Sequence, residues 1–211
     1  MQGHCFMLRG MNAQRQHRAR EAEALFARAG DALRETGDVE HFGLAQLNLG
    51  VARLDLQKVR PAATALHDAL AIFVDLGSTG EIARTKGMLA RVSMVSGRYE
   101  EAREMMTEAR RMLLALEMPE EAGLAGLELV EIFLALRDDF RAVAVLEEVI
   151  AEFTRARLNA RATTALAYLR DMIPKPQAAE AARHVRRYVA GLRAEPERVF
   201  APLPASKHGD A

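Results

Sequence analysis

The chain has 211 residues, half of them hydrophobic, and its 29 Lys and Arg residues are balanced by 29 Asp and Glu residues. This balance excludes a global field that would favour DNA, RNA or an anionic membrane, and the low aromatic content without Trp argues against a base-stacking platform. Cys5 is the only cysteine, so an internal disulfide is excluded and a reducing compartment fits. With no apolar run of membrane-spanning length, we expect a cytoplasmic protein.

Small and large apolar residues recur along the chain at a fixed interval of 40 residues. Leucines at positions 49, 89, 129 and 169 follow this interval. A second series of large apolar residues does so too, at Phe26, Leu66, Met106 and Leu146. A period of 20 to 50 residues is the signature of a repeat array that shares one continuous core. The clearest series consists of alanines: Ala22, Ala62, Ala102, Ala142 and Ala182.

Within each 40-residue unit the apolar residues follow helical spacing, and the alternation typical of strands is absent. Two helices fit in a unit, and Gly37 and Gly77 stand where a C′ glycine would end a helix. Pro174-Lys175-Pro176 predicts a break before the last helix. In chain order we predict ten helices over 2–16, 18–36, 39–56, 59–76, 79–96, 99–116, 120–136, 139–156, 160–173 and 178–193.

We therefore expect a single domain over residues 1–193, followed by an irregular C-terminal tail over residues 194–211. Because one hairpin cannot bury its own apolar face, such an array is stable only when its hairpins are stacked. The predicted repeats cover about 1–37, 38–78, 79–118, 119–158 and 159–193.

Several of these residues carry a family resemblance. Leu49-Gly50 with Ala62, and the turn sequence from Gly97 to Ala102, resemble the tetratricopeptide repeat (TPR) family over nearly the whole chain. The repeat period of 40 residues is longer than the 34 residues common in the family and resembles a variety with longer helices. HEAT and armadillo repeats also have periods of about 40 residues, but the paired small residues favour the TPR. The resemblance implies an all-α, right-handed α-solenoid of about five helix-turn-helix repeats. The last hairpin and tail, from Ala142 to Pro202, also resemble the C-terminal end of certain bacterial TPR-containing regulatory proteins, in which a helix with spaced arginines precedes a segment like Glu195-Pro196 to Phe200.

The sequence contains no constellation that predicts catalysis. The six histidines form no evident ligand set, so we expect no metal and no cofactor, and the Glu pairs suit helix starts and solvated faces. Phosphate-binding loops and nucleophile-elbow motifs are absent from the sequence. Arginines gather near both ends, and Arg9 and Arg186 replace apolar residues of the repeat. We interpret them as caps that solvate the end faces rather than as a nucleic-acid site. An enzyme is therefore not expected.

The resemblance implies that the first helix of each hairpin lines an inner, concave face. Projecting the repeat onto these helices predicts a groove that is basic in the third repeat and acidic in the fourth and fifth. We therefore expect a non-enzymatic scaffold that binds a peptide or partner protein; the alternatives are a sensor region of a bacterial transcriptional or signalling protein, and self-association through the end repeats. The predicted groove residues are Leu44, Asn48, Val51, Arg84, Met88, Arg91, Leu124, Glu128, Glu131, Tyr168 and Asp171.

Overall fold

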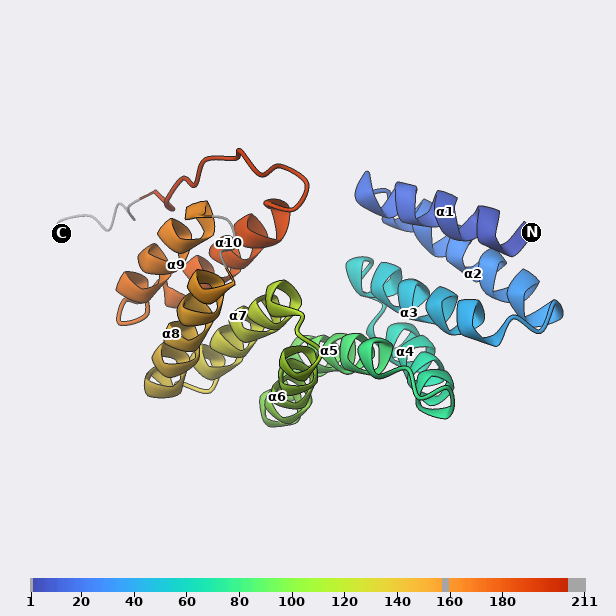
Figure 1. Cartoon of the computed structure of the whole chain (residues 1–211), viewed down its shortest axis with the longest axis horizontal. Coiled ribbons are helices and arrows are strands. Elements are labelled where there is room, and N and C mark those ends of the chain that lie inside the picture. The colour runs from blue at the N-terminus through green and yellow to red at the C-terminus, as the bar shows by residue number, and fades with distance from the viewer. Residues whose placement is uncertain (1, 157–159, 205–211) are drawn as a thin grey trace. The chain divides into compact units, whose positions relative to one another are not determined.

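The computed structural model describes residues 2–156 and 160–204, and over these residues the chain forms ten α-helices and no strand (Figure 1). The predicted helices are confirmed, with bounds that differ by one or two residues. The helices are α1 (Gln2–Arg15), α2 (Ala19–Glu35), α3 (Val39–Asp55), α4 (Val59–Asp75), α5 (Thr79–Val95), α6 (Tyr99–Ala115), α7 (Pro119–Ala135), α8 (Asp139–Arg155), α9 (Ala160–Met172) and α10 (Ala178–Gly191).

The joints between the first eight helices share one geometry, because a residue with positive φ follows each helix. At Gly37, φ is +71°; its N–H donates to the carbonyl of Arg34, and Asp38 N–H donates to the carbonyl of Leu33. These two hydrogen bonds form a Schellman motif, so the prediction for Gly37 and Gly77 is confirmed. The positive-φ residues stand twenty positions apart: His17, Gly37, Gln57, Gly77, Gly97, Glu117 and Arg137.

The chain divides into two compact units, Met1–Met112 and Leu113–Ala211. In unit 1, α1 packs on α2, α2 on α3, α3 on α4 and α4 on α5, while α3 also contacts the neighbouring first helices α1 and α5. The alanines of the 40-residue series have fully buried side chains, and such short side chains allow helices to pack closely. Larger apolar residues fill the space beside them; Phe26, for example, lies directly against Gly10 of the same hairpin.

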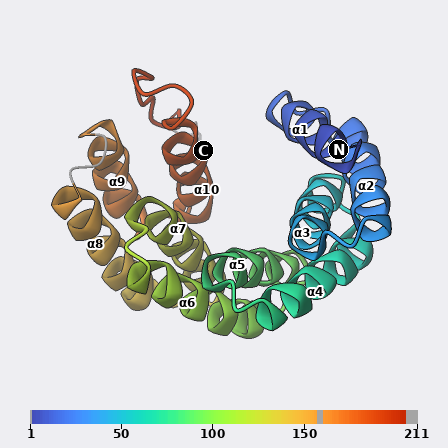
Figure 2. The same ribbon diagram turned by 45° about the vertical axis from the view of Figure 1, so that its right-hand side comes forward.

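In unit 2 the last helix packs differently from the helices of unit 1. There α7 packs on α8 and α8 on α9, but α10, which is the second helix of its hairpin, packs against α7 as well as against α9 (Figure 2). As a result, eleven of the seventeen residues of α7 are buried, against seven in α3 and seven in α5. Apart from four glutamates, α7 consists of apolar residues and glycine, so most of its surface suits burial.

The segment that follows α10 forms no regular element over 194–204, but it is packed against unit 2. The Phe200 ring lies among the rings of Tyr188, Tyr168 and His184, at centroid distances of 5.0, 5.3 and 5.4 Å. Tyr188 Oη donates a hydrogen bond to the carbonyl of Arg198 at 2.9 Å. The remainder of the predicted tail, 205–211, lies outside the described residues. Among the described helices none is both long and apolar enough to cross a membrane.

Candidate functional site

Six of the predicted groove residues lie on α3 and α5 of unit 1, which are adjacent first helices. Each of the six is partly exposed, so each contributes both to packing and to the surface. The α3 residues are mainly apolar, and the amide of Asn48 donates a hydrogen bond to the carbonyl of Leu44 at 2.8 Å. They are Leu44, Asn48 and Val51 on α3, and Arg84, Met88 and Arg91 on α5.

The α5 residues bring two guanidinium groups to this surface, and both interact with groups of the chain itself. Arg84 forms an ion pair with Glu81, one turn earlier in the same helix, at 2.5 Å, and Arg91 Nη1 lies 3.6 Å from the Met88 sulfur. The guanidinium groups are thus held along α5 with a polarizable methionine between them. We call the six residues on α3 and α5 the α3/α5 face.

In unit 2 the predicted groove residues Glu128 and Glu131 are covered by α10. Both are buried, and Arg186 of α10 lies 3.2 Å from Glu128 Oε1 and 2.5 Å from Glu131 Oε1. Burial, the largest influence, lowers the pKa of Arg186, but the two carboxylates and the hydrogen bond to Glu131 outweigh it, so this pKa lies above its ordinary value. The expectation that Arg186 solvates an exposed end face is therefore wrong: it forms ion pairs with two buried carboxylates.

The other predicted residues of unit 2 are divided between intramolecular contacts and solvent. Tyr168 contacts Phe200, and its hydroxyl accepts a hydrogen bond from Leu203 N–H at 3.3 Å. Asp171 is exposed, and Leu124 is partly exposed. In unit 1, by contrast, the six residues of the α3/α5 face are all partly exposed and belong to two helices in contact.

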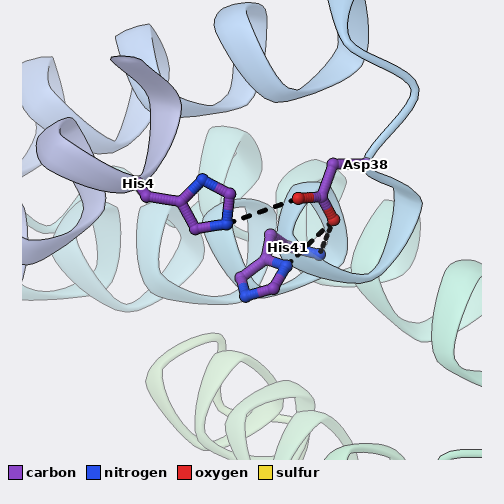
Figure 3. Close-up of side chains that lie close together, drawn as sticks. All are labelled: His4, Asp38 and His41. Carbon is purple, nitrogen blue, oxygen red and sulfur yellow. Dashed lines mark hydrogen bonds and ion pairs between the residues drawn. The ribbon is translucent and has the colours of Figure 1, made fainter. Parts of the chain in front are cut away.

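The structure also brings together Asp38 and two histidines, His4 and His41, for which the sequence predicted no ligand set. His4 of α1 lies with its Nε2 3.3 Å from Asp38 Oδ2, and His41 of α3 lies with its Nδ1 2.9 Å from Asp38 Oδ1 (Figure 3). The two imidazole rings are 4.4 Å apart at their centroids, in an edge-to-face arrangement. The side-chain hydrogen bond from His41 holds the pKa of Asp38 below its ordinary value, although desolvation opposes this shift.

The local sequence explains how this cluster is positioned. The positive φ of Gly37 ends the turn, so that Asp38 becomes the N-cap of α3 and its carboxylate accepts from His41 N–H at 3.3 Å. The i,i+3 spacing of Asp38 and His41 places both on one side of the first turn. That spacing was a signal available in the sequence, whereas the approach of His4 depends on how α1 packs beside α3.

No model of a known protein family matches the chain, and no curated protein matches it. Solved structures show the fold. The apo form of RapI is similar with a TM-score of 0.72 and 14% identity, over 92% of this chain and 72% of that one. BtubC from P. vanneervenii is similar with a TM-score of 0.68 and 18% identity, over 96% of this chain and 83% of that one. A kinesin light chain-related protein of Podosopora anserina with nearly identical TPR-like repeats has a TM-score of 0.64 and 20% identity, over 92% of this chain and 96% of that one. The chain therefore has the TPR-like α-solenoid fold.

Proposed function

We propose that the chain is a non-enzymatic interaction module that binds a peptide or partner protein on the α3/α5 face. The observation that carries the proposal is that α3 and α5 are adjacent and keep six predicted groove side chains partly exposed. The equivalent helix in unit 2, α7, is instead covered by α10 and has its carboxylates paired with Arg186. Unit 1 is thus the part of the chain where this surface is open.

The chemistry of the face indicates what it would bind. Leu44 and Val51 offer aliphatic surface, Met88 adapts its shape to a neighbouring side chain, and Arg84 and Arg91 favour a carboxylate. We infer a partner segment that presents an acidic side chain next to an apolar one. Such a segment would lie across the first helices as a helix or an extended chain.

The test is affinity capture from a lysate of the source organism, with identification by mass spectrometry. The Arg84→Glu/Arg91→Glu variant should lose the partner that the wild type retains. A matched control, Arg20→Glu/Arg60→Glu, makes the same charge change at two exposed positions of the second helices α2 and α4 and should retain it. Equal capture by all three proteins would refute the assignment of the face.

A second candidate is a sensor region of a bacterial regulatory protein. It is supported by the similarity in fold to RapI and to aspartyl phosphate phosphatase F from Bacillus subtilis, of which the chain covers 52% at a TM-score of 0.69. The sequence of the gene upstream of this chain distinguishes the two candidates. A signalling or DNA-binding domain encoded in the same reading frame would favour the sensor; its absence would favour the free-standing module.

A further inference from the structure

We propose that His4, Asp38 and His41 form a binding site for one divalent transition-metal ion of the zinc type. Among the described residues, these three form the group of potential metal ligands: each offers one ligand atom, and the three atoms lie within 4.8 Å of one another. The set combines two imidazoles and one carboxylate from two helices, α1 and α3 (Figure 3). This inference is independent of the proposed function, because it concerns the metal alone.

The distances fit a metal after small side-chain rotations. Zinc binds imidazole nitrogen and carboxylate oxygen at about 2.0–2.2 Å in a tetrahedral arrangement, which places neighbouring ligand atoms roughly 3.3–3.5 Å apart. Asp38 lies 3.3 Å from His4 Nε2 and 2.9 Å from His41 Nδ1. A bound ion would therefore replace the contacts that Asp38 now makes with the two imidazoles.

The ligand types select the class of ion. Neutral imidazole suits Zn²⁺, Cu²⁺ and Ni²⁺, whereas Ca²⁺ and Mg²⁺ prefer six or more oxygen ligands. Asp38 contributes a charge that partly neutralises the ion. It is already held by His41 N–H, so little side-chain freedom is lost on binding.

The site is also open enough to load. The side chains of His4, Asp38 and His41 are 45%, 31% and 40% exposed, so an ion can enter from solvent and a fourth position remains for water or an external ligand. Because His4 belongs to α1, Asp38 is the N-cap of α3 and His41 lies in α3, a bound ion would also link the first repeat to the second.

The test is a titration of the full chain, without an affinity tag, with ZnCl₂ followed by isothermal calorimetry. Wild-type protein should bind one equivalent, and saturating Zn²⁺ should raise Tm by about 5 °C or more. His4→Ala and His41→Ala should each weaken the binding at least tenfold. The control His67→Ala removes an exposed histidine of α4 and should bind as the wild type does. Co²⁺ titration adds an independent readout, because a tetrahedral site gives intense visible absorption bands.

Asp38→Asn separates ligation from folding, since the amide oxygen keeps the N-cap acceptor while the charge is lost. It should keep the wild-type circular dichroism spectrum and lose Zn²⁺ affinity. The proposal is overturned if wild-type protein binds no Zn²⁺. It is equally overturned if the His4, His41 and His67 variants all bind as the wild type does, because that pattern indicates scattered surface histidines.

Discussion

Gly50 of α3 and Leu66 of α4 lie so close that a Cβ atom on Gly50 would stand 2.6 Å from Leu66 Cγ. Leu66 is fully buried within the core cluster of α3 and α4, so a shift of its side chain would disturb its neighbours. The glycine therefore sets the distance at which the two helices of this hairpin approach each other. Gly87 of α5 provides the contrast, since an added Cβ there would meet no atom within 4 Å.

Gly50→Ala should destabilise the protein by about 1–3 kcal/mol, because the new methyl overpacks the hairpin. Gly87→Ala should stabilise it by about 0.5–1 kcal/mol, because alanine loses less backbone entropy in a helix interior. Denaturant unfolding followed by far-ultraviolet circular dichroism measures both changes. A Gly50→Ala protein as stable as the wild type, or more stable, would contradict the close contact.

The turn residues allow a second pair of substitutions in opposite directions. Gln57 has φ +59°, a conformation that favours glycine, and Gly77 occupies the equivalent position at φ +65° with no atom within 4 Å of an added Cβ. Gln57→Gly should stabilise the protein by up to about 1 kcal/mol, and Gly77→Ala should destabilise it by about 1–2 kcal/mol. Thermal unfolding of both variants tests this, and an unchanged Gly77→Ala protein would argue against the left-handed turn.

The buried charges of unit 2 lead to a third prediction. Arg186→Met leaves Glu128 and Glu131 buried without their cation, which should cost about 3–5 kcal/mol. The exposed Arg183 lies in the same helix, and Arg183→Met should change stability by less than about 0.5 kcal/mol. Hydrogen exchange should rise in α7 and α10 of the Arg186→Met protein only.

Replacing the carboxylates tests whether charge is the cause. Combining Arg186→Met with Glu128→Gln and Glu131→Gln should recover part of the loss, because no net charge then remains buried. If the triple variant is less stable than Arg186→Met alone, the loss comes from packing of the arginine stem and the electrostatic account fails.

Phe200 anchors the segment after α10, which leads to a fourth prediction. Phe200→Ala removes three ring contacts, each worth about 0.5–1.5 kcal/mol, so trypsin should cleave after Arg198 several-fold faster. Val199 is 79% exposed, and Val199→Ala should leave the cleavage rate unchanged. Equal rates for both variants would mean that the ring cluster does not hold the segment.

Most of the fold could be predicted from the sequence because the repeat presents the same information several times. The predicted helix 39–56, for example, is observed as Val39–Asp55, and the break at Pro174 to Pro176 is confirmed between α9 and α10. Glycines at turn positions and alanines at close contacts have local causes. The predicted repeat boundaries and the ligand of the groove stay predictions.

The packing of α10 against α7 could not be read from the repeat. Ala182 continues the 40-residue series, so the series predicted the same stacking for the last hairpin as for the others. The high apolar content of α7 indicated that much of it is buried, but the side that α10 covers includes Glu128 and Glu131, which gave no such signal. The approach of His4 to Asp38 depends on tertiary packing between two repeats, which no local pattern encodes.

The twenty-residue spacing of the turns has a consequence for how such a gene changes. Because each joint from His17 to Arg137 has the same backbone conformation, an in-frame duplication or loss of one hairpin's coding sequence would bring together two helix ends of matching geometry. Recombination between neighbouring units would then lengthen or shorten the array while every new junction kept an existing turn.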